Sequence, residues 1–260
     1  IRGMENSYMD LALETESVMA LLDRRMKAEL AMFERALDKC RDYVDFIWTG
    51  EDLGTQRAPL ISLDMFRAQI RPRHQPLVDL ASSYGKPVMI HCCGSSSWAF
   101  EDFIEMGIRA VDTLQPEAAD MDPACLARKY GGRLAFHGCI STAKLAVMTP
   151  EAVAQNVAET LETMMPHHGY CLAPTHYLQD NTPVENVIAM YRTAHRLGRT
   201  CSSPRASSTT ACSRPGSTCA RCRPTNASTR RSPIGAVRGR PAGSKAGISP
   251  PNSSQGGRSI

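Results

Sequence analysis

Five short apolar runs alternate with amphipathic segments along most of this 260-residue chain, and this alternation constrains its fold more than any other feature. We predict strands at the apolar runs, which occupy positions 44–48, 87–90, 110–114, 134–136 and 170–173. Apolar residues at helical spacing predict one long helix, or two with a short break, at 8–41, and further helices at 63–83, 98–106, 121–130, 149–165 and 183–197. Strands and helices in such alternation are typical of βαβ units and a parallel sheet.

Chemically capable side chains follow every predicted strand. They are Glu51 and Asp52, His91 and Cys93, Gln115 and Glu117, His137, and Cys171 with His176. A (β/α)8 barrel builds its active site from the carboxyl ends of several strands, and a doubly wound sheet also binds ligands there. No G-x-G-x-x-G or P-loop motif opens any of the helices, which disfavours a nucleotide-binding sheet. We therefore predict an α/β fold, the C-terminal five βα units of a (β/α)8 TIM barrel, and expect three more units upstream of Ile1.

The composition changes abruptly at position 200. Residues 1–199 hold all 26 acidic residues but only 20 of the 30 lysines and arginines, whereas 200–260 contain no Leu, Met, Phe, Tyr or Trp. A segment without large apolar side chains cannot offset the entropy cost of ordering its backbone, so we predict a disordered basic tail at 200–260. We attribute this tail first to an out-of-frame translation, with a native disordered tail or a basic binding arm as alternatives. The barrel is assigned to 1–199.

The charge and hydropathy of residues 1–199 disfavour several classes of function. Their excess of acidic side chains argues against nucleic-acid binding, which needs clustered lysines and arginines. No window reaches the roughly 18 apolar residues of a membrane span, and the start shows no signal-peptide core. We therefore expect a cytoplasmic protein without a nucleic-acid or membrane partner. The six cysteines of this region are then thiols or metal ligands rather than a disulfide framework.

The sharpest local motif is His91-Cys92-Cys93-Gly94, which directly follows a predicted strand. Because side chains alternate along a strand, His91 and Cys93 share one side while Cys92 points to the other. With Cys171 on a later strand, they would form a His/Cys/Cys zinc site whose fourth position stays open, as catalysis requires. Cysteine is also among the most often buried residue types, so from spacing alone ordinary packing stays open as the alternative.

Several motifs, in order, resemble the uroporphyrinogen decarboxylase superfamily over about residues 8–198. They are GEDLGTQ at 50–56, HCCG at 91–94, QPEA at 115–118, FHG at 136–138 and GYCLAPTH at 169–176. The resemblance implies a (β/α)8 barrel with one of two chemistries. One branch decarboxylates porphyrins without a metal, and its catalytic aspartate is expected upstream of Ile1. The other branch transfers a methyl group from a corrinoid protein to a thiol such as coenzyme M, with zinc held by an H-x-C pair and a cysteine nearly eighty residues later.

The zinc-dependent branch matches this sequence better. His91 and Cys93 correspond to the H-x-C pair, which the decarboxylase branch lacks, and Cys171 follows Cys93 by 78 positions. The resemblance thus implies a methyltransferase in which zinc on these three residues holds the acceptor as a thiolate. The thiolate attacks the methyl group of methyl-cobalt(III), so that the S–CH3 bond forms as the Co–CH3 bond breaks and cobalt(I) is left. The implied cofactors are Zn²⁺ and a corrinoid, and the implied partners are a corrinoid protein and a small-molecule thiol.

The other strand-end residues take supporting roles in this hypothesis, either by orienting the substrate or by holding the ligating histidine. We assign catalytic roles to Glu51 and Asp52, and substrate binding to Gln115, Glu117 and His137. Capping of a strand end by backbone hydrogen bonds is the alternative for Glu51, Asp52, Gln115 and Glu117. His176 matches a histidine with which the decarboxylase branch binds its substrate, so it is also a catalytic candidate. Two alternatives therefore stay open, a metal-free decarboxylase and an inactive or partner-stabilised barrel fragment.

Overall fold

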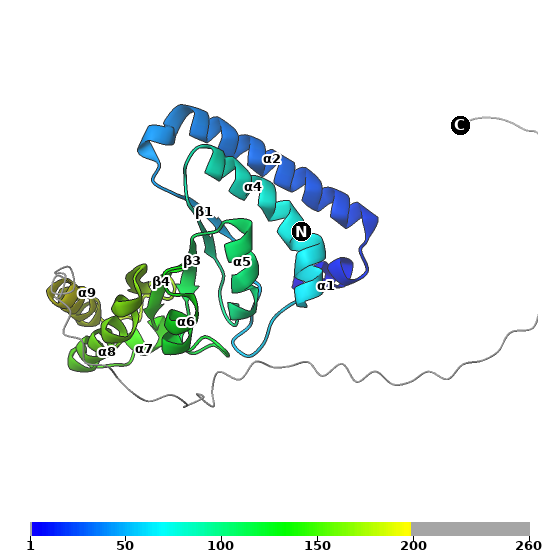
Figure 1. The fold of residues 1–260 in the computed structure, drawn as a ribbon. Helices are drawn as coiled ribbons and strands as arrows, with labels where there is room; N and C mark the ends of the chain where they lie inside the picture. The colour runs from blue at the N-terminus through cyan, green and yellow to red at the C-terminus, as the bar shows by residue number, and fades with distance from the viewer. Residues whose placement is uncertain (1, 199–260) are drawn as a thin grey trace, which may run out of the picture. The chain divides into compact units, whose positions relative to one another are not determined.

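The computed structural model describes residues 2–198 (Figure 1). Its sheet has five parallel strands, Ile47–Gly50 (β1), Val88–His91 (β2), Ala110–Leu114 (β3), Ala135–Ile140 (β4) and Tyr170–Pro174 (β5). The strands pair in the order β1-β2-β3-β4-β5. The predicted parallel sheet is therefore confirmed, whereas the expectations for 200–260 concern residues outside the described part.

Helices lie close to all the predicted positions. The α-helices are Met4–Ala12 (α1), Glu16–Cys40 (α2), Leu63–Met65 (α3), Arg71–Ser83 (α4), Phe100–Met106 (α5), Pro123–Tyr130 (α6), Thr142–Leu145 (α7), Pro150–Met164 (α8) and Val184–Gly198 (α9). Shorter turns are Arg41–Tyr43 (η1), Ser97–Ala99 (η3), Met165–His167 (η4) and the π-helical turn Phe66–Ile70 (η2), which joins α3 to α4. The short α7 is the one helix in residues 2–198 that has no counterpart among the predictions.

Side-chain caps fix where three of these helical segments begin. Ser62, Asp122 and Thr149 each accept a hydrogen bond from the backbone N–H three residues later, at 3.1, 2.8 and 3.3 Å. Pro123 and Pro150 then stand in the first turn of α6 and α8, where a missing N–H costs nothing. The polar and proline residues between strands and helices therefore set the helix starts.

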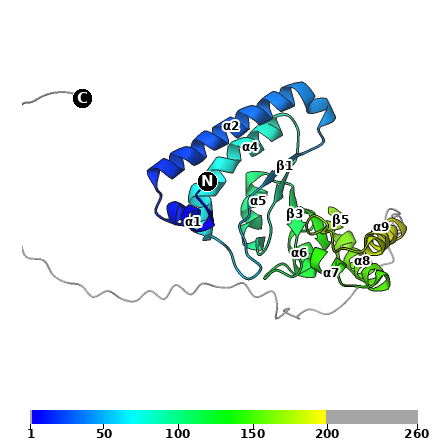
Figure 2. The ribbon, with the colours of Figure 1, turned by 180° about the vertical axis from the view of Figure 1, so that it is seen from behind.

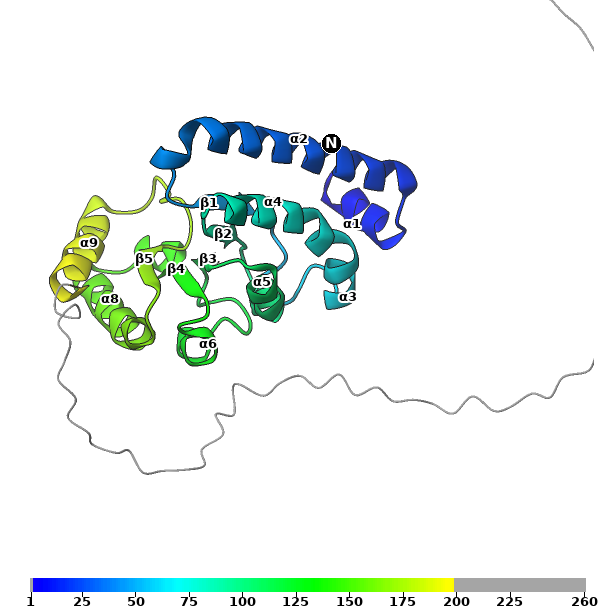
Figure 3. The same cartoon turned by 45° about the horizontal axis from the view of Figure 1, so that its top comes forward.

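The strand order decides between the two α/β architectures that the sequence allowed. A doubly wound sheet reverses its order at a switch point, whereas here every strand pairs with its successor. Because parallel crossovers are right-handed, this order places the connecting helices on one face of the sheet. Figure 3 shows α4, α5, α6 and α8 following one another around that side. The five strands therefore form part of a barrel wall, as predicted.

The first strand begins later than its apolar run predicts. The run at 44–48 predicts a strand there, but β1 occupies Ile47–Gly50. The N–H of Ile47 donates to the carbonyl of Pro87, just before β2, at 2.9 Å, whereas the N–H of Val44 bonds back to Arg41 in η1. Pairing with β2, rather than apolar content, therefore sets the start of this strand.

The main core lies between the sheet and its helices. Phe100 stacks with Phe103 and packs against Tyr130 and Phe136, with ring centroids 5.4–6.1 Å apart. The opposite face of the sheet, which would be the inside of a barrel, is more open, since Trp48 on β1 is 49% exposed there. One face of the sheet therefore serves stability, and the other is available for chemistry.

The long helix α2 lies alongside α4, as Figures 1 and 2 show from opposite sides. Leu37 of α2 is buried, and Arg73 of α4 donates to Asp23 of α2 at 2.7 Å. Within residues 2–198, no helix is both long and apolar enough to cross a membrane.

Candidate functional site

One row of paired residues crosses the whole sheet. It lies at the carboxyl ends of β1 and β2, in the middle of β3 and β4, and near the start of β5. Gly50 pairs with His91, His91 with Asp112, Asp112 with His137, and His137 with Cys171. Directly paired residues of neighbouring parallel strands project their side chains to the same face. Four side chains from four strands, two of them histidines, therefore share the open face of the sheet.

Asp112 is the centre of this row. Its Oδ2 lies 2.8 Å from Nδ1 of His91, and its Oδ1 lies 2.7 Å from Nδ1 of His137. The indole N–H of Trp48 also donates to Oδ2, at 3.2 Å. Since the Asp112 side chain is only 12% exposed, these three groups replace much of the water that a free carboxylate would have.

The hydrogen bonds of Asp112 shift the protonation of the groups that make them. Burial would raise the pKa of Asp112, but the hydrogen bonds with His137 and His91 outweigh it and hold that pKa well below its usual range. The hydrogen bond to Asp112, together with a second one to Cys93, raises the pKa of His91 to about 10. Asp112 is therefore an ionised acceptor at neutral pH, and in the absence of a metal His91 holds its proton strongly.

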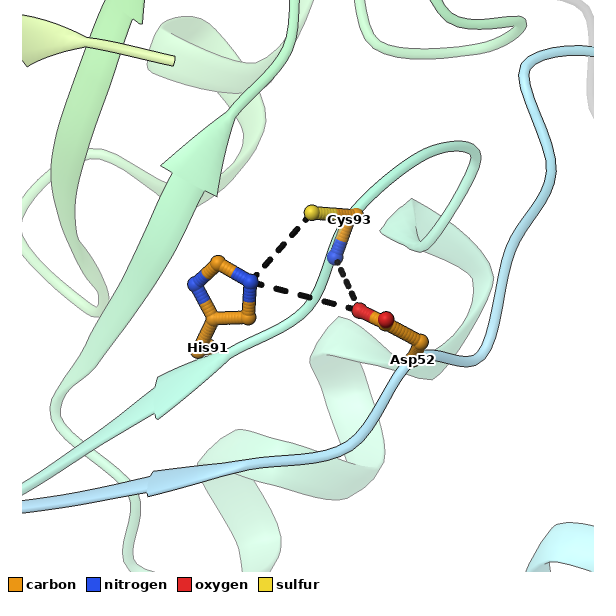
Figure 4. A group of neighbouring side chains, drawn as sticks. All are labelled: Asp52, His91 and Cys93. Atoms are coloured by element: carbon orange, nitrogen blue, oxygen red, sulfur yellow. Dashed lines mark hydrogen bonds and ion pairs between the residues drawn. The ribbon is translucent and has the colours of Figure 1, made fainter. Parts of the chain in front are cut away.

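His91, Cys93 and Asp52 bring three potential metal ligands together (Figure 4). The Sγ of Cys93 lies 3.2 Å from Nε2 of His91, and Oδ1 of Asp52 lies 4.0 Å from the same nitrogen. Oδ1 of Asp52 also accepts a hydrogen bond from the backbone N–H of Cys93, at 3.2 Å. One ligand atom from each residue lies within 4.8 Å of the other two. The loop after β1 thus brings a carboxylate to the H-x-C motif of β2.

Two glycines allow the loops after β1 and β2 to lie this close. Gly94 has φ +72°, and a Cβ on it would stand 2.5 Å from the carbonyl oxygen of Gly54. A Cβ on Gly54 would in turn stand 2.4 Å from the carbonyl oxygen of Ser95. The N–H of Ser95 donates to the carbonyl of Thr55 at 2.8 Å, which joins the two loops. Glycine at both positions therefore makes the contact between Asp52 and Cys93 possible.

The chemistry of these side chains fits a zinc ion. Imidazole nitrogen, thiolate sulfur and carboxylate oxygen are the usual zinc ligands, and two ligands at tetrahedral positions stand about 3.5 Å apart, close to the spacing of His91 Nε2 and Cys93 Sγ. A carboxylate on the far nitrogen of a ligating histidine, as Asp112 stands to His91, is the usual supporting arrangement. Cys92 lies on the other side of β2, where burial raises the pKa of its thiol to about 12, so it stays a packed thiol.

The comparison with family models decides the relationship of this chain to known proteins. The model named uroporphyrinogen decarboxylase (URO-D) matches residues 1–197. The chain belongs to the uroporphyrinogen decarboxylase family. No protein of curated function matches its sequence.

A solved structure supports the fold of this family member. A methyltransferase from Methanosarcina mazei superposes with a TM-score of 0.57 at 21% sequence identity, over 74% of this chain and 53% of the methyltransferase. The chain therefore spans about half the length of that protein. At this identity the likeness concerns the fold, and it agrees with a partial barrel.

Two predicted site residues lie far from the pair His91 and Cys93, one at the end of the row and one beyond β5. Cys171, the predicted third zinc ligand, is exposed on β5 beside His137, and β3 and β4 separate its strand from that of His91. Among residues 2–198, the close group of ligand atoms contains Asp52 rather than Cys171. His176 is exposed beyond the end of β5, where its ring contacts that of Tyr177. The metal role of Cys171 and the substrate role of His176 stay predictions.

The hydrogen bonds and exposure of Glu51, Gln115 and Glu117 can be compared with the roles that we assigned to them. Glu51 lies 3.1 Å, Oε2 to Nε2, from His74 of α4, so its carboxylate is engaged by a helix of the outer layer. Gln115 accepts a hydrogen bond from the backbone N–H of Gly94, at 2.8 Å, and so supports the turn after Cys93. Glu117 is exposed. The helical pattern of 63–83 predicts a surface position for His74, and this is wrong, because His74 is only 7% exposed.

Sequence reasoning missed Asp112 and Trp48. Asp112 stands inside the apolar run at 110–114, where we predicted a strand without giving its one charged residue a role. A charged side chain within a buried strand needs hydrogen-bonding partners, so the position of Asp112 in this run is the sequence signal that could have marked it as a candidate site residue. The identity of its partners, His91 and His137, depends on the pairing of β2, β3 and β4, which sequence spacing does not give.

Proposed function

We propose that this member of the uroporphyrinogen decarboxylase family transfers a methyl group from a corrinoid protein to a small-molecule thiol, at a zinc site held by His91, Cys93 and Cys171. One observation carries the proposal. Nε2 of His91 and Sγ of Cys93 lie 3.2 Å apart on the open face of the sheet, while Nδ1 of His91 is occupied by Asp112. A histidine oriented in this way has one nitrogen left for a ligand.

The residues around this pair have separate tasks in the proposed reaction. Bound zinc would lower the pKa of the acceptor thiol, so that it reacts as a thiolate at neutral pH. Asp112 keeps the ring of His91 oriented, and Asp52 fixes the backbone of Cys93 by accepting its N–H. His137, which pairs with Asp112 on the same row, belongs to the neighbouring surface at which the thiol substrate would bind. The corrinoid partner would approach from the carboxyl ends of the strands.

The metal-free decarboxylase is the second candidate function, because His176 is exposed past the carboxyl end of β5. A substrate acid group is a natural partner for a histidine in that place. Decarboxylation would give the neighbouring side chains of His91 and Cys93 no role in the reaction, and for this reason we prefer methyl transfer.

Methyl transfer is tested directly with methylcobalamin as the donor and coenzyme M or another small thiol as the acceptor. We expect the methyl thioether to form, detected by mass spectrometry, with the loss of methylcobalamin followed by its absorbance. Cys93→Ser should abolish the product, whereas Cys92→Ala, which changes the packed neighbouring thiol, should retain it. If the folded, zinc-supplied protein forms no thioether with any thiol, or if Cys93→Ser is as active as the original protein, the proposed function is wrong.

A further inference from the structure

We propose that Asp112 is a positioning residue for two histidines at once, and that it holds the protons of His91 and His137 on Nδ1 so that both rings keep Nε2 for the site. The inference deepens the proposed function and rests on it only for the metal role of His91. It links the residue that would bind the metal to a residue of the neighbouring substrate surface through one carboxylate.

The geometry around Asp112 fixes one proton on Nδ1 of each ring, whether or not Nε2 is also protonated. Each carboxylate oxygen faces the Nδ1 atom of one histidine, at 2.8 Å for His91 and 2.7 Å for His137. An ionised carboxylate only accepts hydrogen bonds, so both Nδ1 atoms must donate. A neutral imidazole with its proton on Nδ1 has a lone pair on Nε2, which is the form that binds a metal or accepts a hydrogen bond from a substrate.

The positions of the three side chains on the sheet make this arrangement specific. His91, Asp112 and His137 are directly paired across β2, β3 and β4, so the carboxylate stands between the rings. The two rings differ in their outer neighbours, because Nε2 of His91 meets the Sγ of Cys93, whereas His137 pairs along the row with Cys171. Each histidine therefore has a cysteine beside it, and Asp112 accepts a hydrogen bond from both histidines.

The first test reads the protonated nitrogen of each ring by ¹⁵N NMR on the zinc-free chain at about pH 8. In the original protein we expect Nδ1 of both His91 and His137 to carry a proton, whatever the charge of the ring. A proton on Nε2 alone in either ring would overturn the inference, without any variant being needed. Because the measurement is made without zinc, it also stands if the proposed function fails.

Variants sharpen the same measurement. In Asp112→Asn the amide has one acceptor and one donor group, so at least one ring should lose the proton from Nδ1. Trp48→Phe is the matched control, since it removes the third donor to Asp112 and leaves both histidine contacts in place. We expect its two rings to keep protonated Nδ1 atoms. Unchanged protonation in folded Asp112→Asn would contradict the positioning role.

Zinc affinity, measured by competition with a chelating dye, separates this inference from the proposed function. Loss of a carboxylate behind a ligating histidine costs about 10–100-fold in metal affinity, so we expect this loss in Asp112→Asn. His137→Asn, whose amide can donate where Nδ1 did, should keep the affinity within about threefold. Equal affinity in the original protein and folded Asp112→Asn would overturn the positioning of His91 while leaving the zinc site intact. If the original protein binds no zinc, the proposed function is wrong and the NMR result alone decides the inference.

Discussion

Two buried aspartates, one in the helical layer and one in the sheet, show how the hydrogen-bonding partners of a carboxylate determine its role. Asp102 on α5 lies in the helical layer with its side chain 1% exposed, and it accepts hydrogen bonds from Arg67 and Arg71. Asp112 on β3 faces the open side of the sheet and pairs with His91 and His137. In both cases burial would raise the carboxyl pKa, and the hydrogen-bonding partners hold it below its usual range.

The difference lies in what the partners can do next. An arginine side chain is always protonated and has no acceptor, so the pairs of Asp102 with Arg67 and Arg71 only tie α5 to the helical segment that ends in α4. A histidine has a second nitrogen whose state depends on the first. The carboxylate in the helical layer therefore holds two helical segments together, whereas the carboxylate on the open face contacts rings that each have a second nitrogen for a ligand or a substrate.

The largest effect is expected where the loops of the site meet. Gly94→Ala places a side chain on a backbone with φ +72° and 2.5 Å from the carbonyl oxygen of Gly54. We expect it to lower the free energy of unfolding by about 3–5 kcal/mol, from backbone strain and overpacking together. Because the same shift moves Cys93 away from Asp52, zinc affinity should fall as well. Urea denaturation and dye competition measure the two effects.

Gly85→Ala is the matched control, since Gly85 has φ +68° but no atom within 4 Å of the added Cβ. It should cost about 1–2 kcal/mol, from the left-handed backbone alone, and leave zinc affinity unchanged. Equal costs for the two alanine variants would mean that the close contact of the loops does not constrain the site.

The next effect concerns the helical layer. Asp102→Asn removes the negative charge that faces Arg67 and Arg71, and we expect the free energy of unfolding to fall by about 2–3 kcal/mol. The zinc content of the folded fraction should not change, because Asp102 contacts the outer helices. A loss of zinc without a loss of stability would break the contrast between the two aspartates.

The same substitution should alter the response to acid. Since the pKa of Asp102 is lowered in the folded state, its contribution to stability is present above its unfolded value of about 3.9 and is lost as the pH falls through the folded value. We therefore expect Asp102→Asn to flatten the decrease in stability below about pH 4. Thermal unfolding of both proteins across this range measures the slopes, and identical slopes would argue against an ionised, paired Asp102.

The smallest effect is expected at Trp48. Trp48→Phe removes one of three hydrogen bonds to Asp112 and keeps an aromatic ring on β1, so it should cost about 1 kcal/mol of stability. Zinc affinity should stay within about threefold, because both histidines keep their contacts with Asp112. A decrease as large as that expected for Asp112→Asn would show that the indole, rather than the histidines, holds the carboxylate.

Much of the fold follows from local sequence. The alternation of apolar runs and amphipathic segments predicted the five parallel strands, and Ser62, Asp122 and Thr149 are caps whose hydrogen bonds the structure contains. The start of β1 was predicted three residues early, because strand ends depend on a partner strand as well as on hydropathy. Local signals therefore give the order of elements better than their boundaries.

The site was predictable only in part. Period-two alternation placed His91 and Cys93 on one side of β2 and Cys92 on the other, and the structure agrees. The tasks of Glu51 and Gln115 were harder to predict, because their partners, His74 and the Gly94 N–H, come from segments distant in sequence. Asp112 was missed for the same reason. The contacts in such a site depend on which residues of neighbouring strands pair with each other. A single sequence does not give this pairing.

Zinc stoichiometry is the most direct test of the claim that the open face of this sheet is a metal site. Elemental analysis is applied to the purified chain, to Cys93→Ser and to Cys92→Ala, with circular dichroism to establish that each is folded. We predict about one zinc ion per chain in the original protein and in Cys92→Ala, and its loss in Cys93→Ser. A folded original protein without zinc after growth and purification with added zinc, or a Cys93→Ser variant that keeps it, would contradict the account.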